Sequence, residues 1–140
     1  GLDIQVFGGA RLFVDGEEKT VPDAVAYRGM MVDGLPNFSF TVGYLNQSWT
    51  LRADLVSRYM CRLWSMMDED GYTQATPRFP AGLEADIPLM NMDSGYLVRA
   101  RKDLPTQAGV DPWMFAQDYI REYRAWGRPG SDLRADMVFS

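Results

Sequence analysis

The stretch Trp49–Asp70, WTLRADLVSRYMCRLWSMMDED, carries the strongest structural signal in the chain. Its apolar side chains recur every three or four residues, which is the spacing of one face of an α-helix. The stripe comprises Leu51, Leu55, Tyr59, Leu63 and Met67, and it is widened by Val56, Met60 and Trp64. These residues therefore predict one helix of about six turns.

Both ends of this helix are marked by residues that commonly delimit helices. Ser48 can cap the first turn, because a serine oxygen accepts a hydrogen bond from a backbone N–H there. Gly71 follows the last turn, where glycine readily takes the left-handed conformation. Asp54 and Arg58 lie one turn apart and add a favourable ion pair. The helix is therefore predicted to begin at Trp49 and to end before Gly71.

Short strands are predicted on the N-terminal side of this helix. Residues 3–21 hold three short stretches separated by Gly8-Gly9 and by Asp15-Gly16, and both dipeptides favour two-residue hairpin turns. They predict a three-stranded antiparallel meander. Residues 38–42 are aromatic and β-branched and predict a further strand that begins after Pro36. Residues 1–45 are thus expected to be the β-rich part of one domain.

The C-terminal half predicts less regular structure. Residues 72–110 contain four prolines and scattered glycines, which predicts a long irregular excursion over a surface. Asp111-Pro112 predicts the start of a second helix that ends at Gly127, because aspartate caps helices and proline suits their first position. The tail from Arg128 is expected to be loosely held. The expected fold class is α/β, with residues 1–140 forming a single partial domain.

Composition excludes several kinds of function. With 140 residues and 46% apolar residues the chain can bury one core, and its net charge of −5 argues against nucleic-acid or anionic-membrane partners. No apolar run approaches the roughly 20 residues that cross a bilayer, and no signal peptide is evident, so a cytoplasmic protein is expected. The absence of histidine disfavours hydrolase triads and zinc sites. The single cysteine, Cys61, is expected to be a buried thiol.

Several polar and soft residues invite a functional interpretation, but each has a structural alternative. The acidic run at residues 68–70 could bind a cation, although a solvated helix end is favoured. A basic cluster could meet a phosphate, although surface solvation is favoured; it comprises Arg99, Arg101 and Lys102. Five methionines fit either core packing, which is favoured, or a flexible pocket: Met30, Met31, Met60, Met66 and Met67. Gly8-Gly9 does not open a dinucleotide-binding fingerprint, because no helix pattern follows it.

The polar loop at residues 43–51, GYLNQSWTL, is the most informative candidate site. It lies between the predicted strand and the long helix, so unpaired backbone N–H groups and the positive end of the helix dipole face whatever lies beyond it. Such a turn can hold an anion. The alternative is that Asn46 and Ser48 only satisfy the helix terminus while Trp49 packs inward.

A long segment of the chain resembles a known family. Residues 27–55, YRGMMVDGLPNFSFTVGYLNQSWTLRADL, resemble a segment of bacterial flavin-containing monooxygenases of the Baeyer–Villiger type, in the branch that activates thioamide drugs. The family pattern is approximately YKGMM-x-x-G-x-PN followed by GYTNASWTLKADL. The resemblance continues in family order at residues 59–63, 93–99, 104–107 and 112–113, and Gly1-Leu2 resembles the end of a family A-T-G-x motif.

The resemblance implies that the chain is the C-terminal portion of a flavoprotein with two dinucleotide-binding domains, and that it completes the FAD domain. The long helix, within residues 46–71, would then direct its N-terminus at the pyrimidine edge of the flavin. The implied cofactor-binding residues are Asn46, Gln47, Ser48, Trp49 and Thr50. Leu45 and Gln47 replace the usual Thr and Ala of the family, and Thr106 stands where the family often has Lys. The implied catalytic and NADPH-binding residues lie outside this chain.

The activity implied by the resemblance needs FAD, NADPH and O2. NADPH reduces the flavin, O2 adds as a C4a-peroxyflavin, and one oxygen atom passes to a ketone or to a soft sulfur or nitrogen atom. The isolated chain is expected to be inactive without the missing N-terminal part of the parent. A different class of function stays open from sequence alone, namely a self-standing, non-catalytic module that binds a small ligand or a protein.

Overall fold

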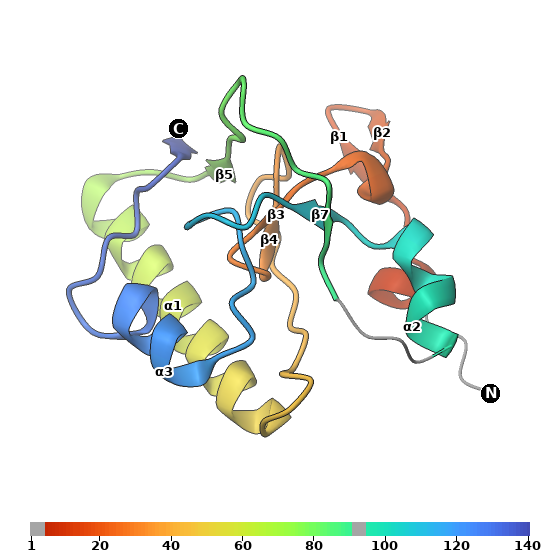
Figure 1. Cartoon of the computed structure of the whole chain (residues 1–140). Coiled ribbons are helices and arrows are strands. Elements are labelled where there is room, and N and C mark those ends of the chain that lie inside the picture. Colours follow the sequence, from red (N-terminus) through yellow and green to blue (C-terminus); the bar gives the residue numbers. More distant parts are fainter. Residues whose placement is uncertain (1–4, 91–94) are drawn as a thin grey trace.

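The structure is a computed structural model that describes residues 5–90 and 95–140, and it arranges short strands beside one long helix (Figure 1). The helical elements are η1 (Val6–Gly9), η2 (Val21–Asp23), α1 (Trp49–Asp70), α2 (Gly95–Ala100), η3 (Arg101–Asp103), α3 (Tyr119–Glu122) and η4 (Tyr123–Gly127), the last being a π-helical turn. The strands are β1 (Leu12–Val14), β2 (Glu17–Lys19), β3 (Ala26–Tyr27), β4 (Met31–Val32), β5 (Ala75–Pro77), β6 (Ile87–Pro88), β7 (Thr106–Gln107) and β8 (Met137–Phe139). The expected mixture of helix and strand is confirmed.

The long helix α1 has the predicted bounds and the predicted inner face. Its buried residues are Arg52, Leu55, Val56, Tyr59, Met60, Leu63 and Met67. Gly71 ends the helix with φ at 75°, and Asp54 pairs with Arg58 at 2.8 Å. Leu51 and Trp64 lie outside the buried stripe, with 41% and 50% of their surfaces exposed. The stripe is therefore narrower than the periodicity indicated, and an arginine belongs to it.

The strands form four separate antiparallel pairs within the described residues. β1 pairs with β2, β3 with β4, β5 with β8, and β6 with β7. The turn at Asp15-Gly16 joins β1 and β2 as predicted, with Phe13 opposite Glu18. β5 and β8 lie far apart in sequence, and Thr76 faces Val138 across them. Pairs this short depend on side-chain packing for their stability.

The second and third strands of the predicted meander are confirmed as β1 and β2, but its first strand does not form within the described residues, and the predicted strand at residues 38–42 is wrong. Asp3 and Ile4 lie outside the described residues, and Gly8-Gly9 belongs to η1, where Phe7 and Gly8 have φ of 50° and 66°. Residues 38–42 form no strand, and the backbone N–H of Phe40 donates to the carbonyl of Met30 at 2.8 Å. The rings of Phe38 and Phe40 instead lie 5.1 and 5.0 Å from that of Phe7. Aromatic packing, rather than strand pairing, explains the composition of this segment.

The hairpin of β3 and β4 was not predicted from the sequence. Its turn places Arg28 and Gly29 at positive φ, 50° and 59°, and the N–H of Met30 donates to the carbonyl of Tyr27 at 3.0 Å. A Cβ atom on Gly29 would lie 2.8 Å from the side chain of Phe115. Glycine is therefore required here both by the backbone conformation and by close packing.

The second helix begins later than predicted. Asp111-Pro112 does not start it, and α3 begins at Tyr119 with the Asp118 side chain accepting from the N–H of Arg121 at 2.8 Å. Two backbone N–H groups before α3 donate to side chains rather than to a helix, that of Phe115 to Gln107 at 2.6 Å and that of Ala116 to Glu122 at 3.1 Å. Side-chain acceptors therefore outcompete the predicted first turns.

The C-terminal tail is held against the rest of the chain, contrary to the expectation of a loose end. β8 pairs with β5, and the carbonyl of Ser140 accepts from the N–H groups of Thr73 and Gln74 at 2.8 and 2.9 Å. The rings of Tyr72 and Phe139 lie 5.2 Å apart. The excursion at residues 72–110 is largely irregular but contains β5, β6, α2 and β7.

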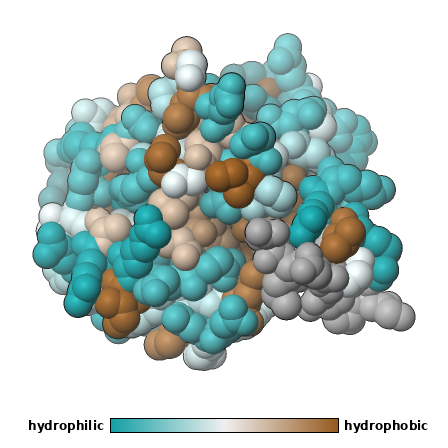
Figure 2. Space-filling view, in the orientation of Figure 1, coloured by the Kyte–Doolittle hydropathy of each residue, from teal (hydrophilic) through white to brown (hydrophobic). Residues whose placement is uncertain are grey.

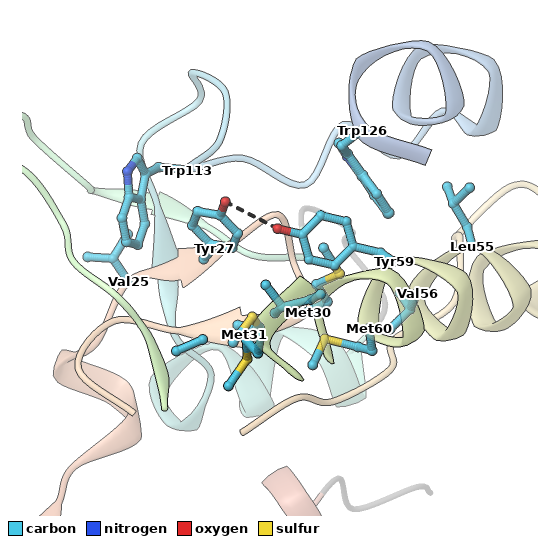
Figure 3. Close-up of a cluster of buried hydrophobic side chains, with 13 residues drawn as sticks. Val25, Tyr27, Met30, Met31, Leu55, Val56, Tyr59, Met60, Trp113 and Trp126 are labelled. Atoms are coloured by element: carbon cyan, nitrogen blue, oxygen red, sulfur yellow. Dashed lines mark hydrogen bonds between the residues drawn. The ribbon is translucent and has the colours of Figure 1, made fainter. Parts of the chain in front are cut away.

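The core packs α1 against the β3–β4 hairpin and two tryptophans (Figure 3). The hydroxyl groups of Tyr27 and Tyr59 point toward each other at 3.5 Å. Trp113 meets Tyr27 edge to face at 5.3 Å, and Trp126 meets Tyr59 in the same way at 5.7 Å. Four methionines are buried here, which confirms their core assignment: Met30, Met31, Met60 and Met67. Met66 is partly buried against this core.

The surface corrects one expectation. Cys61 is exposed, because it lies on α1 outside the buried stripe. On the face drawn in Figure 2, hydrophobic residues form separate spots among hydrophilic ones. Within residues 5–90 and 95–140, no helix has the length and apolar character needed to span a membrane.

We expect Leu63→Ala to lower the free energy of unfolding by about 2–5 kcal/mol, because it opens a cavity beneath α1. Leu63 is 1% exposed. Leu51→Ala is the matched control on the same helix, and it should change stability far less because Leu51 is largely solvated. Urea unfolding followed by circular dichroism measures both. Equal losses for the two variants would contradict the assignment of the inner face.

Candidate functional site

The candidate site is the exposed loop that leads into α1. The five residues proposed to bind a cofactor, Asn46, Gln47, Ser48, Trp49 and Thr50, are all exposed at this end of the helix. Trp49 does not pack inward, since 61% of its surface is exposed. Its ring lies against Gly43, where a Cβ atom would come within 2.1 Å of it. The loop therefore turns sharply over a tryptophan that remains accessible.

The first turn of α1 lacks the side-chain cap that Ser48 was expected to supply. Ser48 occupies the N-cap position in an extended conformation, but its side chain makes no capping hydrogen bond. Its Oγ lies 2.7 Å from Oγ1 of Thr50 instead. The leading N–H groups of a helix have no partners within the helix. The end of this 22-residue helix thus presents uncapped backbone donors and a positive dipole.

The segment before α3 holds the loop in place from one side. The N–H of Leu45 donates to Oε1 of Gln117 at 2.9 Å. The N–H of Tyr119 donates to Oε1 of Gln47 at 3.1 Å. The carboxamide oxygen of Gln47 is therefore already engaged by the chain, whereas Asn46, Trp49 and Thr50 project from the same loop. Of the five residues, Gln47 has the clearest structural role.

A buried ion pair lies beneath the site. Arg52 is the fourth residue of α1, and its Nη1 donates to Oε2 of Glu122 with both side chains almost fully buried. Nη2 of Arg52 donates to the carbonyl of Arg28 at 2.5 Å. The hydroxyl of Tyr44 donates to Oε2 of Glu122 at 2.6 Å. One buried carboxylate thus joins α1, α3 and the start of the polar loop.

The surroundings of this pair are aromatic. The guanidinium carbon of Arg52 lies 4.5 Å from the ring centre of Phe115 and 5.0 Å from that of Trp126. Burial raises the pKa of the Glu122 carboxyl, and the nearby Arg52 charge acts in the opposite direction. Burial, reinforced by Glu122, also raises the pKa of the Tyr44 hydroxyl, so this hydroxyl remains a hydrogen-bond donor at neutral pH.

The other sequence candidates do not form a comparable site among the described residues. The side chains of residues 68–70 are exposed, and Asp70 pairs with Arg134. No group of three or more potential metal ligands is found within residues 5–90 and 95–140. In the basic cluster, Arg99 and Lys102 are exposed and Lys102 lies 4.0 Å from Asp103. Asp93 and Ser94 of the family motif at 93–99 lie outside the described residues.

Arg52 and Glu122 are functional candidates that were not predicted from the sequence. The signal for Arg52 was available, because it precedes Leu55, Val56 and Tyr59 by three, four and seven residues and so falls on the buried face of α1. A charged residue on an apolar stripe predicts a buried partner. The identity of that partner was not accessible, since Glu122 lies 70 residues away along the chain.

We expect Glu122→Ala to lower the free energy of unfolding by about 3–5 kcal/mol, because it leaves the Arg52 charge buried without its partner. Calorimetry or urea unfolding of the chain measures this loss. The double variant Arg52→Met with Glu122→Leu should recover most of it, since both charges are then absent. A double variant as unstable as Glu122→Ala would contradict this origin of the effect. Asp54→Asn, in an exposed ion pair, is the control and should leave stability almost unchanged.

Comparison with known proteins identifies curated relatives. No family model and no solved structure matches the chain. The chain is 42% identical over 124 residues to the FAD-containing monooxygenase EthA of Mycobacterium tuberculosis. The aligned region covers 89% of this chain and 25% of that protein. EthA of Mycolicibacterium smegmatis is 40% identical over an aligned region that again covers 89% of this chain and 25% of the relative. The protein named "Probable FAD-binding monooxygenase AlmA" of Acinetobacter baylyi is 35% identical over 126 residues, again 89% and 25%.

The matched region covers most of this chain but only part of each relative. The chain spans about a quarter of the length of the curated relatives it matches. All of these relatives are named as FAD-containing or FAD-binding monooxygenases. Over 89% of its length, the chain is therefore similar to one segment of FAD-containing monooxygenases.

Proposed function

We propose that this chain is the C-terminal portion of an FAD- and NADPH-dependent monooxygenase of the Baeyer–Villiger type, and that the start of α1 faces the flavin. The observation that carries this proposal is the uncapped, exposed N-terminus of α1 in a chain similar to one segment of FAD-containing monooxygenases. Asn46, Gln47, Ser48, Trp49 and Thr50 form the flavin side of the loop. The chain alone has no oxygenase activity in this proposal.

The donor groups of this loop fit a flavin. A flavin ring presents a carbonyl group and a ring nitrogen at its pyrimidine edge, and reduction adds negative charge there. Backbone N–H groups at a helix N-terminus suit such acceptors, and the helix dipole favours the added charge. The exposed ring of Trp49 adds an apolar surface beside these donors. Ser48 does not compete for the donors, because its hydroxyl lies against Thr50.

The residues of this chain orient the flavin and shape its environment. When bound, the flavin supplies the redox chemistry that activates O2 for transfer of one oxygen atom to a ketone or to a soft sulfur or nitrogen atom. The first turn of α1 stabilises negative charge at the pyrimidine edge, which favours the reduced state. The rest of the complete protein supplies the groups that bind NADPH and the substrate.

We expect Trp49→Pro to weaken FAD binding by the complete protein roughly tenfold more than Trp49→Ala, because only the proline variant lacks the N–H at residue 49. Proline is tolerated at the first position of a helix, and Ser48 already has the extended conformation that precedes proline, with ψ at 131°. Quenching of flavin fluorescence during titration measures both affinities.

The pair of variants separates the backbone donor from the indole ring. Equal affinities for Trp49→Pro and Trp49→Ala would show that the N–H at residue 49 does not contact the flavin. A complete protein that binds no FAD under any condition would instead overturn the proposed function and favour a non-catalytic binding module.

A further inference from the structure

The segment at residues 116–122 determines the conformation of the candidate flavin loop. It contacts the loop at three successive points, and none of these contacts belongs to a helix or strand ladder. Gln117 accepts from Leu45, Tyr119 donates to Gln47, and Glu122 accepts from Tyr44. The backbone donors that follow at residues 48–50 therefore depend for their direction on a segment about 70 residues later in the chain.

Glu122 connects these contacts to α1 itself. Its Oε2 accepts from Arg52 and from Tyr44, and its Oε1 accepts from the N–H of Ala116. Tyr44 lies just before the loop and Arg52 just after it. The two side chains that bracket the loop thus meet on one oxygen atom, and any movement of Glu122 moves both ends of the loop.

Two further arginines that donate to backbone carbonyls, the partly buried Arg62 and the buried Arg28, do not share this arrangement. Arg62 donates to the carbonyls of Trp126 and Gly127, at 2.6 and 3.0 Å, and so completes the end of η4. Arg28 donates to the carbonyl of Asp132 at 3.3 Å and lies between aromatic rings. Both arginines hold the C-terminal part of the chain. Of these three arginines, Arg52 is the one whose contacts connect to the loop that leads into α1.

Stability alone gives a weak reason for such a group. The loss of hydration when an ion pair is buried offsets much of the attraction between its charges. Well-packed apolar residues of similar volume often stabilise a protein equally well. A charged pair with a fixed hydrogen-bond geometry, in contrast, defines a single arrangement of the groups that contact it. The Glu122 carboxylate has this property, because Arg52, Tyr44 and Ala116 approach it from three elements.

We propose that Glu122, with Arg52 and Tyr44, is a positioning residue for the flavin: it fixes the loop at residues 44–48 so that the first N–H groups of α1 point at the pyrimidine edge. This inference rests on the proposed function. It assigns to the buried cluster a role in tuning the bound flavin, beyond its contribution to folding.

The test uses the complete protein with FAD bound and compares Tyr44→Phe, Gln117→Met and Glu122→Gln with Asp54→Asn. Tyr44→Phe and Gln117→Met each remove one contact to the loop, and Glu122→Gln weakens the contacts of its carboxylate with Arg52, Tyr44 and Ala116. None of the three variants changes the proposed flavin-facing residues. Asp54 is the matched control, because it lies on α1 in an exposed ion pair. The readouts are the midpoint potential of the flavin, its visible spectrum, kcat/KM and Tm.

We expect the three variants to retain one FAD per chain, to shift the midpoint potential to more negative values, and to lower kcat/KM by up to about 100-fold. The potential shifts because misdirected donors stabilise the reduced flavin less. The control should keep the wild-type potential, spectrum and kcat/KM. If Glu122→Gln fails to fold, Tyr44→Phe and Gln117→Met decide the outcome, since each removes only one hydrogen bond.

Wild-type potentials and spectra in both Tyr44→Phe and Gln117→Met would overturn the positioning role, even if their Tm values fell. In that case FAD binding by the wild-type protein would still support the proposed function. Failure of the wild-type complete protein to bind FAD would overturn both inferences together. The two failures are therefore distinguishable by the wild-type protein alone.

Discussion

The buried contact between Arg52 and Glu122 is the constraint on which the rest of the structure depends. Both charges are removed from water, so each needs partners that replace its hydration. The chain supplies them from distant segments, with the carbonyl of Arg28 on one side and the Tyr44 hydroxyl and the Ala116 N–H on the other. The β3–β4 turn, the polar loop, α1 and α3 consequently have one relative arrangement, and Gly29 allows the close approach of Phe115 that completes it.

This central cluster matters more because the strands are so short. Each described sheet has two strands, and no continuous ladder runs through residues 5–90 and 95–140. Packing of α1 against aromatic and methionine side chains therefore carries the fold. Several large apolar residues at the start of α1, on α3 and on η4 remain exposed, among them Trp49, Ile120 and Tyr123.

Local sequence patterns were sufficient to predict α1 but not to predict the conformation of the segments around it. The helix was predictable because its stripe, its ion pair and Gly71 all act within a few residues of one another. Residues 38–42 and 111–118 were not, because their conformations are set by distant partners such as Phe7, Gln107 and Glu122. The same distinction holds for the candidate site. The loop before α1 was recognisable from sequence, whereas Glu122 beneath it required the fold. Whether Asn46, Gln47, Ser48, Trp49 and Thr50 contact a flavin remains a prediction.

Hydrogen–deuterium exchange of the complete protein, measured with and without FAD, tests most directly whether the start of α1 faces the flavin. Backbone N–H groups that gain an acceptor exchange more slowly. We expect FAD to slow exchange in peptides that cover residues 44–51, and to leave exchange unchanged in peptides that cover the distant β1–β2 hairpin. Unchanged exchange at residues 44–51, in a protein shown by its absorbance to hold FAD, would contradict the account.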